Sequence, residues 1–248
     1  KMTYISNKDF IIEVVKGNVA GHSLVPKLGQ NPDVDTVSIP EDIWNLGGTY
    51  TGFPTGSPET VDCVSTSASD TGVLTITGLQ TSASTEYTSE DITLTGTTPV
   101  TSSNSYYRIH TARYSSGTST GLNVGTISVN HTTTTANVFL NIVIGKSQSN
   151  MAGYTVPSGS TAYIINEFTL IKDGGTAVDA EIAFWIRPLS GSPRLRRPLS
   201  ITSVVATNGI VRAPITVGGG SDIMPRVTAT SNNNLTIEVG YDLLIVED

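Results

Sequence analysis

From residue 61 onward, apolar and polar residues alternate with a period of two, and turn-forming residues interrupt the alternation every few positions. Segments such as GVLTITGL, ANVFLNIVIG and LTIEVGYDLLIVED are rich in the β-branched and aromatic residues that favour strands. The separators SASDTG, DGGT and SNNN contain the Gly, Asn and Asp residues that turns require. No segment keeps a helical period for three turns. The pattern therefore predicts an all-β fold: residues 57–248 form an antiparallel β-sandwich body of the jelly-roll kind, and a split near residue 148 into two subdomains stays open.

The first part of the chain has a different pattern. After an alternating run at residues 10–15, glycine or proline interrupts residues 17–40 every few positions, which is too often for a long helix or a central strand. We interpret residues 1–56 as an extended N-terminal arm with too few consecutive apolar positions for a core of its own. Its order is expected to depend on a partner, into which Phe10, Ile12 and Leu24 would insert.

One short helical turn is predicted inside this arm, in the segment SIPEDIW at residues 38–44. Pro40 suits the first turn of a helix, and the carboxylates of Glu41 and Asp42 suit its positive end. The turn is expected to end by Gly47. We expect Asp33 and Asp35, which precede the turn, and Trp44, at its end, to contribute to the same partner contact.

Composition narrows the class of protein. Of 248 residues, only 14% are charged, and the net charge is −7. This balance disfavours a general nucleic-acid binder, because such proteins neutralise phosphates with Lys and Arg. The sequence has no run of 18 apolar residues and no basic, apolar leader, so we expect neither a membrane span nor a secretory signal. Because the sequence has a single cysteine, no internal disulfide can form, and we expect packing alone to stabilise the fold.

The charges are distributed unevenly along the chain. Between Lys27 and Arg108 there are ten acidic residues and no basic one, whereas residues 187–226 contain six arginines and one aspartate. Arginine is suited to planar, bidentate pairs with carboxylates at interfaces. We therefore expect Arg194, Arg196 and Arg197 to meet the acidic segment of a neighbouring subunit, with a solvated loop as the simpler alternative.

Few residues suggest a catalytic or metal-binding role. His22, His110 and His131 are isolated, and Cys63 lies in a strand pattern without a basic neighbour that would activate it. A glycosidase needs two carboxylates, and two groups of acids are candidates for that role: Glu86, Glu90 and Asp91, and Asp33 with Asp35. The spacing of Asp33 and Asp35 could also donate oxygens to calcium, but the glycine and the distant glutamate of a helix-loop-helix calcium site are missing. Nothing in the sequence indicates that any pair shares a cleft. We predict no catalytic residue, no metal site and no cofactor.

Several motifs together carry a family resemblance over nearly the whole chain. The arm motifs VVKGNVAGHSLVPKLGQNPDVDT and IPEDIWNLGGTYTGFP, followed by VSTSASDTG, SEDITLTGTTPV and YTVPSGSTAY, resemble structural proteins encoded by tailed bacteriophages, particularly podovirus-like and marine ones. The resemblance implies a non-enzymatic virion component that is made in the host cytoplasm. It does not fix the position on the particle.

Three virion roles stay open. An irregular arm followed by a compact β body favours a capsid decoration or cement protein that binds the assembled major capsid lattice as a homotrimer on the capsid surface. A neck or tail adaptor is the first alternative, and a carbohydrate-binding receptor or fibre protein is the second. The last role would place aromatic residues on a concave face, and the candidates are Trp44, Tyr106, Tyr107, Tyr114 and Trp185. No nucleic-acid or membrane partner is expected.

Overall fold

The computed structural model describes residues 9–53, 57–115, 121–133, 137–172, 178–189, 191–202 and 206–248. Within these ranges the chain is all-β, its strands pair antiparallel, and one six-residue helix is present, α1 (Phe10–Val15). The prediction of an antiparallel all-β fold is confirmed. The described part of the chain contains no helix with the length and hydrophobicity that crossing a membrane requires.

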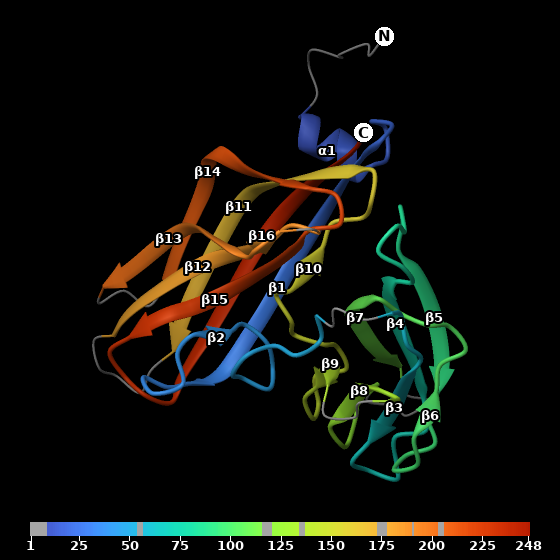
Figure 1. Ribbon diagram of the computed structural model, residues 1–248. Coiled ribbons are helices and arrows are strands. Elements are labelled where there is room, and N and C mark those ends of the chain that lie inside the picture. Colours follow the sequence, from blue (N-terminus) through green and yellow to red (C-terminus); the bar gives the residue numbers. More distant parts are fainter. Residues whose placement is uncertain are drawn as a thin grey trace.

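The strands form two sandwiches that lie side by side (Figure 1). We name the larger one the main sandwich. Its strands are β1 (His22–Val34), β2 (Glu41–Asp42), β10 (Tyr154–Thr155), β11 (Ser160–Lys172), β12 (Asp179–Arg187), β13 (Arg194–Thr202), β14 (Ala206–Gly218), β15 (Asp222–Thr230) and β16 (Leu235–Glu247). Sheet 1 has the strand order β1-β16-β11-β14, and sheet 2 has the order β10-β15-β12-β13, with β2 paired to β15.

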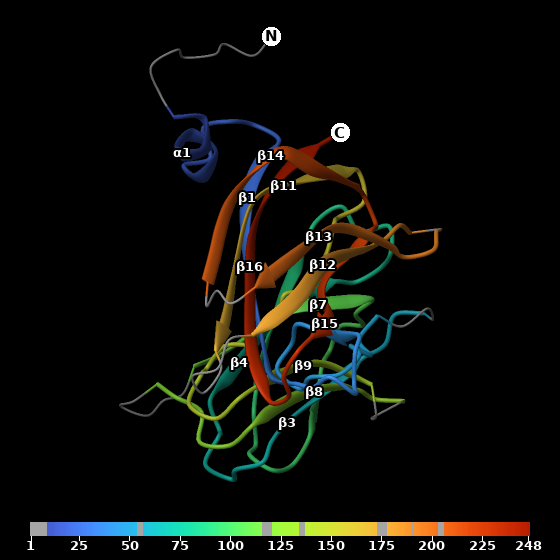
Figure 2. The same cartoon turned by 90° about the vertical axis from the view of Figure 1, so that its left-hand side faces the viewer.

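The smaller unit, which we name the insert sandwich, lies in the chain between β2 and β10. Its strands are β3 (Val61–Ser65), β4 (Val73–Leu79), β5 (Thr88–Thr93), β6 (Val100–Thr101), β7 (Arg108–Ser115), β8 (Ile127–His131) and β9 (Val138–Ile142). Sheet 3 has the order β6-β3-β8-β9, and sheet 4 has the order β5-β4-β7. Figure 2 shows both sandwiches from the side of the main sandwich.

Each sandwich has its own hydrophobic core. In β16 the buried residues alternate with less buried ones, from Leu235 and Ile237 to Leu243 and Ile245, as the period-two pattern predicts. One cluster of buried residues lies between sheets 1 and 2, and a second lies between sheets 3 and 4. The insert core takes residues from Trp44 to Met151 together with Met224, and the main core takes Val34, Ile43 and residues from Ala152 onward. One of the two boundaries therefore lies close to residue 150, near the position at which the sequence pattern leaves a split open.

Much of the expected arm belongs to the main sandwich. Residues 22–34 form β1, which pairs with β16 from the His22–Val246 pair onward, and Val34 is buried in the main core. The interpretation of residues 1–56 as an arm separate from the body is therefore wrong for this segment. Pro26 and Pro32 obscured the strand pattern, but an edge strand tolerates proline because one row of its N–H groups faces no partner.

The expected helical turn at residues 38–44 is also wrong. Glu41 and Asp42 form the short strand β2. Their carboxylates accept hydrogen bonds from Asn31, Gly48 and Tyr50, outside the predicted turn, and Asp42 forms a salt bridge with distant Arg226. The helix forms instead at α1, where the side chain of Asp9 caps the N–H groups of Ile11 and Ile12. The acidic residues of SIPEDIW therefore make tertiary contacts and do not cap a helix.

Candidate assembly surfaces

The residues predicted to bind partners are dispersed over the molecule. Ile12 on α1 is half exposed, Phe10 packs edge-on against His22, and Leu24 is a partly buried residue of β1. Asp33 is exposed, while Asp35 accepts a hydrogen bond from the backbone of Asn234. The structure does not bring these residues together into one surface.

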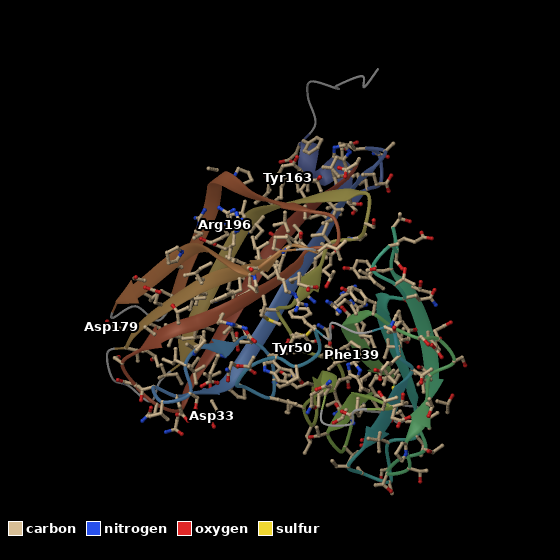
Figure 3. All side chains as sticks on the ribbon, in the orientation of Figure 1. Asp33, Tyr50, Phe139, Tyr163, Asp179 and Arg196 are labelled. Atoms are coloured by element: carbon tan, nitrogen blue, oxygen red, sulfur yellow. The ribbon has the colours of Figure 1, made fainter. Side chains whose placement is uncertain are left out.

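Trp44 is not at the surface. It is buried in the core of the insert sandwich, with its ring edge-on to Tyr50 at a centroid distance of 5.0 Å. Tyr50 in turn donates a hydrogen bond to the carbonyl of Phe139, and both residues lie at the junction of the sandwiches (Figure 3). Trp44 therefore anchors the segment that enters the insert, and its assignment to a partner contact is wrong for the isolated chain.

Salt bridges within the chain use most of the described arginines in the basic segment. Arg226 pairs with Asp42, Arg187 pairs with Asp222, and Arg197 reaches Glu167 of the opposite sheet at 2.9 Å. Among the described side chains, Arg194 and Arg196 are exposed and have no ion-pair partner. The charge asymmetry along the sequence is thus partly neutralised inside one chain, and Arg197 forms its ion pair within the chain.

A buried cluster around Asp222 joins the two sandwiches. Its carboxylate accepts hydrogen bonds from Nε of Arg108 at 2.9 Å, from Nε of Arg187 at 2.9 Å and from the hydroxyl group of Thr155 at 2.6 Å. Arg108 comes from β7 of the insert, whereas Asp222 and Arg187 come from the main sandwich. Because the desolvated carboxylate binds cations from both units, the cluster fixes their relative orientation. The sequence offered no sign of this pairing, since the partners are separated by up to 114 positions.

The acids considered as catalytic candidates either accept hydrogen bonds that hold a loop in place or are exposed at the surface. Burial alone would raise the pKa of Glu90, but hydrogen bonds from the backbone of Ser103 and Asn104 and from the Tyr106 hydroxyl hold this pKa below its usual value. Its oxygens therefore act as acceptors that close a loop. Glu86 and Asp91 are exposed.

The isolated histidines and the cysteine show no metal-binding arrangement in the described residues. No group of three or more His, Cys, Asp and Glu side chains gathers there. Burial raises the pKa of the Cys63 thiol to about 12, so the thiolate is scarce at neutral pH. His131 stacks on Phe139 inside the insert, with ring centroids 4.1 Å apart.

The aromatic candidates for glycan binding are mostly core residues. Tyr106 and Tyr114 are buried in the insert, like Trp44. Tyr107 and Trp185 are partly buried, and each has a guanidinium group over its ring: Arg108 at 3.8 Å and Arg226 at 4.7 Å from the centroid. These cation–π contacts cover the faces of Tyr107 and Trp185 and leave no row of free aromatic faces among these five residues.

A surface that the sequence analysis missed lies on two neighbouring loops of the insert sandwich. We name it the apolar tip, and its residues are Leu122, Val124, Val143 and Ile144, which are 46%, 56%, 39% and 59% exposed. Large apolar side chains that gather at one exposed place mark interaction sites in soluble proteins. Sequence reasoning missed the tip because the two loops are about twenty residues apart and neither shows a periodic pattern.

Buried hydrogen bonds hold the apolar tip in shape. Asn123 is 2% exposed, and its amide donates to the carbonyls of Gly125 and Val143 while its side-chain oxygen accepts from the N–H of Ser147. The carboxylate of Asp70 accepts from the N–H groups of Val124 and Gly125 at 2.8 Å each. Both loops are thus tied to the body of the insert, and the tip loses little conformational entropy when a partner covers it.

Comparison with known proteins does not assign the chain to a family. No family model matches the chain, and no curated protein matches it. Among solved structures, the subviral particle of infectious bursal disease virus VP2 is 10% identical over 91% of this chain and 71% of that chain, with a TM-score of 0.23. The PBSX exported protein XepA is 9% identical over 89% of this chain and 84% of that chain, with a TM-score of 0.20. Likenesses this small carry no argument about fold or function.

Proposed function

We propose that this chain is a structural protein of a virus particle, without enzymatic activity, and that it decorates the outside of an assembled capsid. The sequence motifs that resemble tailed-phage structural proteins support the virion role. The apolar tip supports attachment to another protein, and it is the observation on which the proposal chiefly rests. A neck or tail position would use the same tip on a different part of the particle.

We also infer that the main sandwich is a jelly roll. Its eight principal strands occupy the orders β1-β16-β11-β14 and β10-β15-β12-β13, so that the chain crosses repeatedly from one sheet to the other. Jelly rolls recur in viral capsid proteins and also in lectins. Because unrelated functions share the jelly roll, the proposed function rests on the surfaces of the chain and not on the fold.

The tip has the properties that attachment to a preformed lattice requires. Four aliphatic side chains in fixed positions supply apolar area that becomes buried on binding, at about 25 cal/mol per Å². A patch of this size is smaller than a typical stable protein interface. Many copies bound to a repeating lattice, or copies joined to one another as the predicted homotrimer, would compensate through multivalency.

The test is co-sedimentation of the purified chain with particles of the virus that encodes it, after the chain has been removed from them. Val124→Asp combined with Ile144→Asp places two charges in the tip and should abolish binding. Val37→Asp is the matched control, because Val37 is 88% exposed on the main sandwich. Separating heads from tails on a density gradient distinguishes decoration of the capsid from the neck or tail role. Binding that survives the double substitution would refute attachment through the tip.

A further inference from the structure

A hollow with a volume of about 480 Å³ lies where the two sandwiches meet, beside the Asp222 cluster. We name it the junction hollow. The start of β7, the end of β12 and the turn before β15 supply its lining, together with residues 191–193 of the loop that leads to β13. Small-molecule sites commonly have volumes of about 300–1,000 Å³. The junction hollow is therefore large enough for a small-molecule ligand.

Two positive groups of this lining share one negative group. Nε of Arg108 and Nε of Arg187 each donate to the carboxylate of Asp222 at 2.9 Å, and the Thr155 hydroxyl donates to the same carboxylate at 2.6 Å. Asp222 is the only acidic residue in the described lining of the hollow. Two guanidinium groups and one carboxylate leave one positive charge in excess. Because a desolvated charge is stabilised by an opposite one, the hollow favours an anion.

Arg187 is the member of the cluster that is open to a ligand. Its side chain is 27% exposed, compared with 4% for Arg108 and 5% for Asp222. Nε and Nη2 of Arg187 donate to Asp222, but within the described part of the chain Nη1 reaches only the carbonyl of Phe53, at 3.5 Å. A normal N–H···O hydrogen bond measures about 2.7–3.2 Å. Nη1 is therefore available to donate to an acceptor in the hollow.

The guanidinium group of Arg187 is held in place before a ligand binds. Asp222 fixes one edge of it, and the ring of Phe53 lies with its centroid 5.1 Å from Cζ, in a cation–π contact. The same ring contacts Arg108 with a centroid distance of 5.2 Å. A group that is already fixed loses little side-chain entropy when it binds. Arg187 is therefore arranged in advance to recognise an anion.

The rest of the lining is partly polar and partly apolar. Ser192 adds a hydroxyl group, while Pro188, Leu189 and Pro193 add apolar surface. Leu189 packs over Gly220, where an added Cβ atom would lie 3.1 Å from Cδ2 of the leucine. Ligand sites generally combine apolar walls with a few polar groups that fix the orientation of the ligand. This mixture suits a sugar-like molecule, because a sugar carries hydroxyl groups together with apolar C–H faces.

Charge and shape together identify the ligand as a carboxylate. One excess positive charge matches a monoanion, whereas a phosphate monoester carries a charge of about −1.5 to −2. The planar fork of an arginine also matches the two oxygens of a carboxylate. We propose that the junction hollow binds a small carboxylate of the size of a sugar acid, whose carboxylate group accepts hydrogen bonds from Arg187. The site shares no residue with the apolar tip and goes beyond the proposed role on the particle.

The experiment titrates the full chain with sodium glucuronate at low salt and measures the dissociation constant by ligand-observed NMR. Glucose is the matched neutral probe, because it has the same ring without the carboxylate. Glucuronate should bind at least about ten-fold more tightly than glucose, and more tightly than inorganic phosphate. Arg187→Gln should weaken glucuronate binding at least about ten-fold. Arg113→Gln changes an exposed arginine of β7 outside the lining and should leave glucuronate binding unchanged.

A second pair of variants keeps the buried cluster intact, because Arg187→Gln also removes a partner of Asp222. Leu189 lines the hollow and is 52% exposed. Leu189→Glu introduces a carboxylate that competes with the ligand for Arg187, and it should weaken glucuronate binding at least about ten-fold. Leu189→Gln has the same length without the charge and should preserve binding. Circular dichroism of every variant verifies that it is folded.

Three results would overturn the proposal. The first is a wild type that shows no glucuronate binding, and the second is an affinity for glucose or phosphate that equals the affinity for glucuronate. The third is equal glucuronate binding by Leu189→Glu and Leu189→Gln. Both Leu189 variants should co-sediment with particles like the wild type, so that this proposal and the proposed attachment can fail separately.

Discussion

The ammonium group of Lys27 is buried at the junction of the two sandwiches, where it should make the stability of the fold depend on pH. Lys27 is 8% exposed, and its Nζ donates to the carbonyl of His110 in the insert at 2.8 Å. Burial lowers the pKa of Lys27 from 10.5 to about 7. Between these two values the unfolded chain keeps a proton that the folded chain loses. The free energy of unfolding therefore rises with pH in this window.

The size of the effect follows from the pKa shift. Each pH unit in the window contributes at most about 1.4 kcal/mol, and the rise from pH 7 to 8.5 is at most about 2 kcal/mol. Below pH 7 the lysine is charged in both states and the penalty is fully present. Above pH 9 the buried thiol of Cys63 acts in the opposite direction, because its pKa is raised. The useful window is therefore pH 7 to 8.5.

Lys27→Met keeps the length of the side chain and removes its charge. It also removes one hydrogen bond to a buried carbonyl, which costs about 1–3 kcal/mol at every pH. Urea unfolding at several pH values should show the stability of the wild type rising by about 2 kcal/mol across the window, while the variant stays nearly flat. Lys146→Met, on the surface of the insert, should keep the wild-type slope. If Lys27→Met and the wild type rise in parallel, the buried lysine is not the cause and the reasoning fails.

Three further predictions concern the junction and the first strand. Asp222→Asn leaves buried Arg108 without its carboxylate and should lower the free energy of unfolding by about 3–5 kcal/mol in urea titrations, whereas exposed Asp33→Asn should have little effect. Gly29→Ala would place a Cβ atom 2.2 Å from the backbone nitrogen of Ala152 and should cost about 1–3 kcal/mol in thermal unfolding, whereas Gly218→Ala, which meets nothing within 4 Å, should be tolerated. Deleting residues 1–34 removes β1 and exposes the edge of β16, so circular dichroism should show that cooperative unfolding is lost. Deletion of residues 1–20 should preserve cooperative unfolding. A cooperative transition in the longer deletion would show that β1 is dispensable.

The strands of the body were predictable because their pattern reflects a local physical requirement. In β4 and β16, one face is buried and the other is not, so burial imposes the alternation that the sequence displays. Thr75 and Thr77 show the same rule on the exposed side, where threonine combines strand propensity with a hydroxyl group. The all-β class follows from such segments alone.

The long-range arrangement was not predictable from the same patterns. β1 pairs with β16, more than 200 positions away, and nothing local in a proline-bearing edge strand reveals its partner. The Asp42–Arg226 salt bridge joins the acidic and basic segments within one chain, although their asymmetry pointed equally well to a contact between chains. The apolar tip and the junction hollow likewise arise only when distant segments are brought together.

Electron cryo-microscopy of the intact particle tests the proposed virion role most directly. The account predicts density for a two-sandwich protein on the outside of the capsid, with Leu122, Val124, Val143 and Ile144 of the insert against a capsid subunit. Density for the chain at the neck or tail would contradict decoration of the capsid. Particles that contain no copy of the chain at any position would contradict the structural role altogether.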